Sequence, residues 1–342
     1  MLDQRETEQL PPTAAAQHVV LMVQSPLDVP VQLEYVFRHP EARLTIIVVG
    51  TRGVFDYLKA LELDAEVIFV QPVLRSGSAV AYLQQLREQR AQLRELVPQV
   101  DEIRYGSEYQ DLVTACFVEA HRHTARIVKV ATEIDALERF ADPLSVRDRA
   151  ITAGFTLVLR LVLGLRVTVF RLNGQLVFQH IAPYAKRVDY APSPEMFARY
   201  GRTLAPEPGV NILLFESNGQ DDRHFVNYEP DLRALIEMLQ RLGTVYVKPH
   251  PSRGYSRLLA EAGVRTVAAE VPASLLQPEH FAMVVGIDTA ALREIRHPRV
   301  VSVIDSFSFR SGTGKKQIKA YLRQGNGKDI VFKRTEELIH GI

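Results

Sequence analysis

The sequence predicts a two-domain α/β protein in which each domain holds a largely parallel sheet flanked by helices. The chain has 342 residues, 46% of them hydrophobic, which is enough for two domains that each bury a core. Short apolar runs alternate with helical segments along both halves, which is the pattern of repeated strand-helix-strand units. A proline-rich stretch at 183–208 interrupts this alternation near mid-chain, and we interpret it as the connection between domains.

In the first half, apolar runs bounded by polar residues predict the strands of one sheet. Residues 54–63 and 79–97 have helical spacing, and the second segment is polar apart from regularly spaced leucines. The apolar stretch at 151–170 contains two arginines and two glycines, so we expect a buried helix and strand there instead of a membrane span. The expected strands are His18–Val23, Arg43–Val49, Glu66–Val70, Glu102–Tyr105 and Arg126–Val130.

After the proline-rich stretch the alternation restarts and predicts a second, smaller sheet. The sequence therefore divides into a disordered polar leader at 1–17, an N-terminal domain at 18–185, a connection at 186–208 and a C-terminal domain at 209–342. The leader lacks the basic and apolar regions of a secretion signal. Strands are expected at Asn211–Phe215, 245–248, 264–267, 282–285 and 300–304, with helices at 232–242, 255–262 and 290–296.

Composition limits the partners and the compartment. The 41 basic residues balance the 40 acidic ones, which gives no sign of a nucleic-acid partner. The single cysteine, Cys116, cannot form an internal disulfide and stands among apolar residues, so we expect a buried thiol and a cytoplasmic protein. Peripheral contact with the inner face of a membrane stays open.

The sharpest motif is Lys-Pro-His-Pro-Ser at 248–252, directly after the second strand of the C-terminal half. Lys248, His250 and Ser252 supply hydrogen-bond donors, and the two prolines restrict the backbone that carries the imidazole. A turn with these donors can bind a phosphate. The same letters also fit a strand-terminating turn in which His250 satisfies a nearby carbonyl.

Lys-Pro-His-Pro in this position resembles the His-Pro motif of bacterial sialyltransferases and polysialyltransferases. The resemblance implies the GT-B fold, in which two Rossmann-like domains face each other across a cleft, an architecture shared with periplasmic binding proteins and several epimerases. It also implies that His250 binds the donor phosphate or acts as general acid, with Lys248 as electrostatic support. The reaction it implies is a metal-independent, inverting transfer of a nonulosonic acid from a CMP-sugar to a glycan or glycolipid, with no cofactor.

A second element of the resemblance follows the strand at 282–285. Members of the family have a glycine and then two hydroxyl residues at a helix start, where hydroxyls and backbone N–H groups bind phosphate. Gly286 and Thr289 match this pattern, whereas Asp288 replaces a hydroxyl. An aspartate repels phosphate, so Asp288 is expected to cap the helix, to bind a ribose hydroxyl or to orient His250.

The third element is an acidic pair after the last strand of the N-terminal half. Glu133 and Asp135 stand there, separated by one residue and without the glycine that follows the pair in the family. The resemblance implies that one of them removes the proton of the acceptor hydroxyl, with Glu133 preferred. Because the motif is altered, a homologue without activity and a solvated loop at Asp135 remain alternatives.

Polar residues after two further strands complete the predicted cleft. Ser25, in a Ser-Pro-Leu segment that resembles one in the family, and Gln24 are candidate sugar contacts, although a proline-started helix accounts for the same letters. Ser217 and Asn218 are candidate nucleotide contacts or members of an exposed turn.

Two other clusters receive local explanations. His121 and His123 are interpreted as cations at a helix C-terminus and not as metal ligands. The stretch 312–316 lacks the first glycine of a Walker loop, so ATP hydrolysis is not expected, although its lysines and Arg310 can attract an anionic substrate. Alternatives to the sialic acid-like donor are a Kdo donor, another nucleotide-sugar or polyol-phosphate transfer, and a non-catalytic homologue that binds a glycan.

Overall fold

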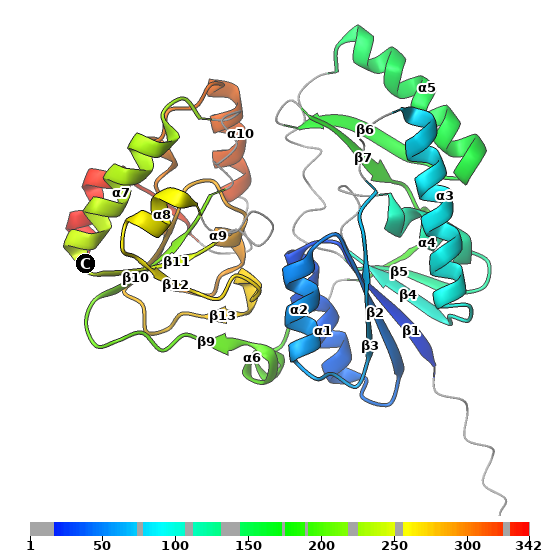
Figure 1. Ribbon diagram of the computed structural model, residues 1–342, viewed down its shortest axis with the longest axis horizontal. Helices are drawn as coiled ribbons and strands as arrows, with labels where there is room; N and C mark the ends of the chain where they lie inside the picture. The colour runs from blue at the N-terminus through cyan, green and yellow to red at the C-terminus, as the bar shows by residue number, and fades with distance from the viewer. Residues whose placement is uncertain are drawn as a thin grey trace, which may run out of the picture.

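The protein consists of two parallel six-stranded sheets with helices on their faces (Figure 1). The structure, a computed structural model, describes residues 17–73, 78–106, 112–130, 144–172, 175–188, 191–217, 225–249, 256–323 and 329–341.

The first sheet has the strand order β3-β2-β1-β4-β5-β8 with every pairing parallel. The helical connections from β1 to β2 and from β2 to β3 lie on one face of the sheet, and the later connections lie on the opposite face. The strand order therefore reverses between β1 and β4. Its strands are β1 (His18–Val23), β2 (Arg43–Val49), β3 (Glu66–Val70), β4 (Glu102–Tyr105), β5 (Arg126–Val130) and β8 (Lys186–Val188), and its helices are α1 (Val29–Arg38), α2 (Arg52–Ala60), α3 (Ala79–Leu96), α4 (Val113–His121) and α5 (Val146–Leu163).

The second sheet repeats this plan with the order β12-β11-β10-β14-β15-β16, again parallel throughout. The order reverses between β10 and β14. The strands are β10 (Asn211–Phe215), β11 (Thr244–Lys248), β12 (Arg265–Thr266), β14 (Met283–Gly286), β15 (Val300–Ser302) and β16 (Val331–Phe332), and the elements around them are α7 (Tyr228–Leu242), α8 (Arg257–Glu261), η3 (Ala273–Leu275), α9 (Ala291–Glu294), η4 (Ile304–Ser306), α10 (Gly312–Arg323) and η5 (Thr335–Gly341).

The predicted fold class is confirmed, and the five strands expected in the first half have the predicted bounds. The structure adds β7 (Gln175–His180), which the sequence analysis missed and which forms an antiparallel hairpin with β6 (Val167–Leu172), the strand expected within 151–170. It also adds β8, inside the segment expected to connect the domains, and a short pair of β9 (Arg202–Thr203) with β13 (Leu276–Gln277). Cys116 is buried, as predicted.

The expectation of a buried helix within 151–170 is wrong for one face of that helix. One face of α5 packs on the domain through Thr152, Leu159 and Leu163, but the opposite face is open to solvent. Large side chains on that face, including Leu157 and Leu161, are more than half exposed. An apolar residue count cannot distinguish the two cases, because an exposed apolar face and a buried one have the same composition.

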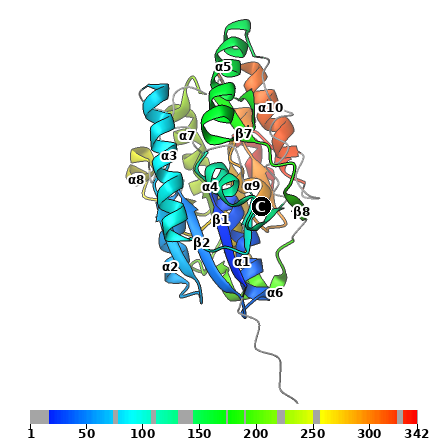
Figure 2. The ribbon, with the colours of Figure 1, turned by 90° about the vertical axis from the view of Figure 1, so that its right-hand side faces the viewer.

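The two sheets share one hydrophobic core through the helix α6 (Pro194–Tyr200). The inner faces of β1, β2 and β10 belong to the same cluster of buried side chains as Met196 and Phe197 of α6. Figure 2 shows α6 beside α1 at the foot of the molecule. The N-terminal domain and the C-terminal domain are therefore joined by packing as well as by the chain.

Polar contacts hold α6 to both domains. Glu34 of α1 accepts hydrogen bonds from the backbone N–H and the hydroxyl of Ser193, at 2.7 and 2.8 Å, and Tyr57 of α2 donates to the carbonyl of Tyr200. On the other side, the guanidinium of Arg296 stacks 3.6 Å from the centre of the Phe197 ring.

Candidate functional site

The candidate site lies where the strand order of the C-terminal sheet reverses. In a doubly wound sheet, the loops after the two strands at this point diverge and leave room for a ligand at the carboxyl edge. These strands are β10 and β14, and their last residues, Phe215 and Gly286, are register partners. The residues that follow them therefore lie side by side.

Ser217 and Asp288 meet across this point. The Ser217 hydroxyl donates a hydrogen bond of 2.5 Å to Oδ1 of Asp288, although the residues are 71 positions apart in the sequence. Ser217 is almost fully buried and Asp288 is partly exposed. A second hydrogen bond holds the turn that carries Asp288: the Ser302 hydroxyl donates to the carbonyl of Ile287 at 2.7 Å.

Two further polar side chains, missed by the sequence analysis, complete what we call the switch-point cluster: Glu216, Ser217, Tyr228 and Asp288. Glu216 is buried, and Tyr228 is the first residue of α7. Burial, together with the carboxylates of Glu216 and Asp288, raises the pKa of Tyr228, so its hydroxyl keeps its proton at neutral pH. The cluster offers two carboxylates and a neutral hydroxyl, which can accept donors from a ligand and repel an anion.

Lys248 is the last residue of β11, the strand next to β10, and its ammonium group forms hydrogen bonds within the domain. It donates hydrogen bonds to the carbonyls of Ala269 at 2.9 Å and Pro249 at 3.2 Å. Burial lowers the pKa of Lys248 to about 8, although the nearby Glu270 opposes this shift. The lysine therefore ties the end of β11 to the loop that leads into η3.

Gly286 and Thr289 have local roles at the start of α9. A Cβ on Gly286 would lie 2.9 Å from Cδ2 of Leu292, so the glycine lets α9 approach β14. The Thr289 hydroxyl accepts a hydrogen bond of 3.3 Å from the backbone N–H of Ala291. The helix itself is only four residues long, shorter than the predicted 290–296.

Gln24 and Ser25 follow β1, at the corresponding point of the N-terminal sheet. Ser25 forms a capping box with Asp28: its hydroxyl accepts the N–H of Leu27, and the Asp28 carboxylate accepts the backbone N–H groups of Gln24 and Ser25. Both candidate residues are buried. The short helix that they begin, η1 (Pro26–Asp28), contacts η3 of the C-terminal domain, so the carboxyl edges of the two sheets approach each other here.

Several candidate residues lie outside the described part of the chain. They are the catalytic candidates Glu133, Asp135 and His250 and the binding candidates Ser252 and Asn218. Their roles remain predictions.

The structure describes parts of the two local clusters. His121 is buried beside Phe117, and burial, with Arg94 and Arg90 nearby, lowers its pKa, which disfavours the cation expected there. Residues 312–316 form the first turn of α10. The ammonium of Lys315 donates to the carbonyl of Phe307 at 3.1 Å and lies 3.7 Å from a carboxylate oxygen of Asp305, whereas Lys316 is exposed.

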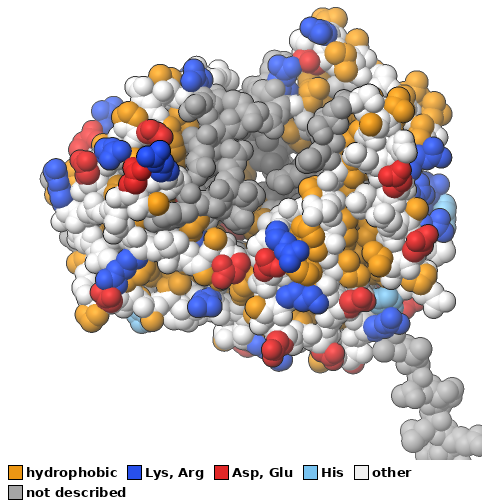
Figure 3. Space-filling view, viewed as in Figure 1, with side chains coloured by type: hydrophobic (Ala, Val, Ile, Leu, Met, Phe, Trp, Pro, Cys, Tyr) orange, Lys and Arg blue, Asp and Glu red, His pale blue; other side chains and the backbone are white. Residues whose placement is uncertain are grey.

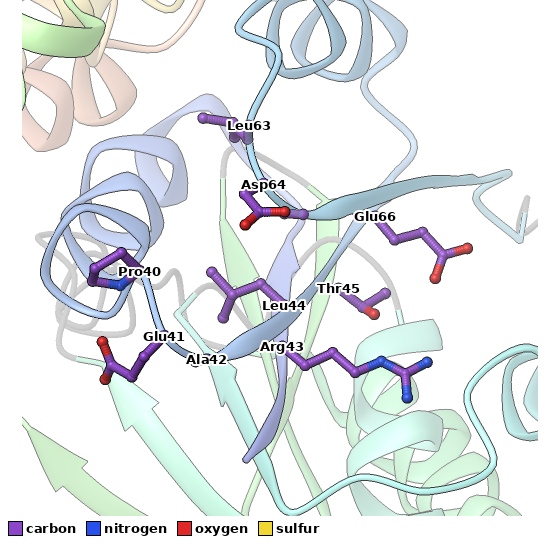
Figure 4. Close-up of a pocket in the computed structure, with 10 residues that line it drawn as sticks. Pro40, Glu41, Ala42, Arg43, Leu44, Thr45, Leu63, Asp64 and Glu66 are labelled. Carbon is purple, nitrogen blue, oxygen red and sulfur yellow. The ribbon is translucent and has the colours of Figure 1, made fainter. Parts of the chain in front are cut away.

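A hollow of about 470 Å³ lies at the opposite edge of the N-terminal sheet, where β2 and β3 begin (Figure 4). Its charged side chains are Glu41, Arg43, Asp64 and Glu66. Because ligands of doubly wound sheets bind at carboxyl edges, this hollow is separate from the candidate site. Within the described ranges, no cluster of three or more His, Cys, Asp or Glu side chains could hold a metal ion.

No protein-family model matches this chain, and no curated protein does. Among solved structures, a protein from Listeria monocytogenes described as a UDP-N-acetylglucosamine 2-epimerase superposes with a TM-score of 0.50 at 8% identity, covering 96% of this chain and 87% of that one. A UDP-GlcNAc 2-epimerase from Neisseria meningitidis gives 0.44 at 10% identity, covering 95% and 90%. A glycosyltransferase from Streptomyces sp. SF2575 gives 0.45 at 12% identity, covering 95% and 89%.

Similarity at this level of identity shows the fold alone. No helix in the described residues has the length and hydrophobicity to cross a membrane. With two parallel sheets of the same strand order, this chain has a GT-B-like fold of two Rossmann-like domains.

Proposed function

We propose that this protein is a glycosyltransferase that takes its sugar from a nucleotide-sugar donor bound at the carboxyl edge of the C-terminal sheet. The observation that carries the proposal is the Ser217–Asp288 pair, which fixes a carboxylate at the point where the order of β10 and β14 reverses. Polar side chains fixed at this point are the usual means of orienting a nucleotide in a doubly wound domain.

The chemistry of the switch-point cluster favours the nucleoside over the phosphate as its ligand. A carboxylate only accepts hydrogen bonds, and the vicinal hydroxyls of a ribose are good donors. Asp288 and Glu216 would repel a phosphate placed against them. We therefore assign the ribose to Asp288 and the phosphate to the segment 248–252, whose sequence supplies the donors of His250 and Ser252.

The resemblance of the 248–252 segment extends the proposal to the reaction. The donor is a CMP-activated nonulosonic acid, such as sialic acid, and the transfer is inverting and needs no metal. The acceptor hydroxyl oxygen attacks the anomeric carbon while the bond to CMP breaks, and Glu133 or Asp135 takes the hydroxyl proton. His250 stabilises the charge on the departing phosphate or gives it a proton, with Lys248 as electrostatic support. Gln24 and Ser25 line the sugar side, and the acceptor is a glycan or glycolipid.

Calorimetric titration with CMP, UDP and GDP tests the donor. We expect CMP to bind at least about tenfold more tightly than the other two, because a factor of ten needs only 1.4 kcal/mol of specific contacts. A preference for UDP would instead favour the nucleotide class named for the epimerases of this fold. Failure of all three nucleotides to bind would leave a non-catalytic, glycan-binding protein.

Activity tests the catalytic residues separately. Hydrolysis of a CMP-sugar, or transfer from it, should fall by about 100-fold or more in Glu133→Ala, as expected for loss of a general base. If Glu133→Ala and Asp135→Ala both keep the wild-type rate, neither residue is the base.

A further inference from the structure

The solvent face of α5 carries an apolar stripe that no described element covers. Of the thirteen large hydrophobic side chains exposed in the described residues, five lie on this helix. The stripe consists of Val146, Ala150, Ala153, Leu157 and Leu161, whose spacing places them on one side of the helix and opposite its buried face. Val146 is 85% exposed and Leu161 is 75% exposed, so the stripe is open at both ends.

Arginines border the stripe. Arg147 and Arg149 stand near its start, Arg160 near its end and Arg166 just beyond it, and all four are exposed. The one carboxylate between residues 144 and 172 is Asp148, which accepts a 2.6 Å hydrogen bond from Arg171 and also pairs with Ser145. The surface around the stripe is therefore positively charged, although the whole chain is nearly neutral.

The position of α5 exposes the whole stripe to a flat surface. The helix lies at the outer edge of the N-terminal domain, at the top of both ribbon views (Figure 1, Figure 2). Hydrophobic side chains gather over it in the space-filling view (Figure 3). Eighteen residues of helix present a line about 27 Å long.

We propose that α5 binds this protein to the surface of an anionic lipid bilayer. The apolar stripe enters the boundary between headgroups and acyl chains, and the bordering arginines pair with lipid phosphates. A second copy of the chain fits this face less well. It would place arginines against arginines, and residues 149–172 contain no carboxylate to offset them. Membrane binding through α5 does not depend on which nucleotide the C-terminal domain takes.

Sedimentation with lipid vesicles tests this. We expect the protein to bind vesicles that contain phosphatidylglycerol, to bind pure phosphatidylcholine weakly, and to be released by salt. The variant Leu157→Asp/Leu161→Asp should bind the anionic vesicles at least about tenfold more weakly, because it places two charges in the apolar face. Arg149→Glu/Arg160→Glu should lose the preference for phosphatidylglycerol.

The matched control is Val80→Asp/Leu96→Asp on α3. It changes two exposed apolar residues, 73% and 57% accessible, to the same acid on a different helix of the same domain. It should keep vesicle binding, and circular dichroism should show that both double variants are folded.

Two results would overturn the proposal. The first is a failure of the α5 stripe in the vesicle assay: either the wild-type protein does not bind anionic vesicles, or the α5 variant binds them as strongly as the α3 control does. The second is a wild-type dimer in solution that the α5 variant converts to monomers while vesicle binding stays unchanged, which would assign the stripe to a second copy of the chain.

Discussion

Ser217 and Asp288 are joined by a 2.5 Å hydrogen bond between the loops that follow β10 and β14. The bond orients a carboxylate at the carboxyl edge of the C-terminal sheet, beside the buried Glu216. If a nucleotide binds here as proposed, a fixed acceptor at this edge should attract its hydroxyls and repel its phosphates.

Replacing Asp288 by asparagine should weaken binding of cytidine and CMP by the same factor, about tenfold, because a hydrogen bond to a charged group contributes about 1.5 kcal/mol or more. Asparagine keeps an oxygen for Ser217, so the loop should stay in place. Calorimetric titration of both ligands measures the two factors. Tighter binding of CMP, with cytidine unchanged, would show that Asp288 faces the phosphate.

Lys248→Met should change how stability depends on pH. The pKa of Lys248 is lowered from 10.5 to about 8 in the fold, so between these values the unfolded chain binds more protons. The free energy of unfolding of the wild type should therefore rise with pH across this window, by up to about 3 kcal/mol relative to the variant. Urea unfolding of both proteins at about pH 7 and about pH 10 measures this. Equal pH dependence in the two would mean that the ammonium is well solvated.

Glu119 of α4 fastens the hairpin and the loop after it to the N-terminal domain. Its buried carboxylate accepts hydrogen bonds from Tyr184 at 2.7 Å and Arg122 at 3.1 Å and lies 3.1 Å from His180 of β7. Burial opposes ionisation, but these partners hold the pKa of Glu119 below its usual range. The stabilisation is thus present above about pH 4.5 and should be lost as the pH falls through the lowered pKa.

Glu119→Ala should therefore lower the free energy of unfolding by about 3 kcal/mol at neutral pH, the usual cost of breaking a buried pair. The control is Glu88→Ala, which removes an exposed carboxylate of α3 and should change stability by less than about 0.5 kcal/mol. Urea unfolding compares the two, and equal losses would contradict a special role for Glu119.

Gly286→Ala should destabilise the protein by about 1 to 3 kcal/mol, because the added methyl group meets Leu292 in a packed interior. The double-mutant cycle with Leu292→Ala identifies the cause. In that background the alanine at 286 has room, so its cost should be smaller. Additive costs would show that the backbone, and not Leu292, excludes a side chain.

Much of the fold could be predicted because buried parallel strands are continuous apolar runs that end at polar residues. The bounds of β1 and β10 followed directly from such runs. A strand was expected within 151–170, where β6 lies in part, but its hairpin partner β7 was not predicted. The pair Asn173-Gly174, which stands between the two strands in the sequence, is a strong hairpin signal that could have revealed it.

The site was only partly predictable. Placing polar residues at strand ends identified Ser217 and Asp288, but their hydrogen bond depends on the register of β10 and β14, which the sequence does not state. Tyr228 was missed because its role follows from its carboxylate neighbours and not from a motif. The open face of α5 was missed because only the packing reveals which leucines lack neighbours.

The hydrophobic core that passes through α6 determines how the two domains unfold. Neither half can unfold without uncovering apolar side chains of the other, since Met196 and Phe197 belong to the same cluster as β1 and β10. Heating in a calorimeter should therefore give one cooperative peak in place of two.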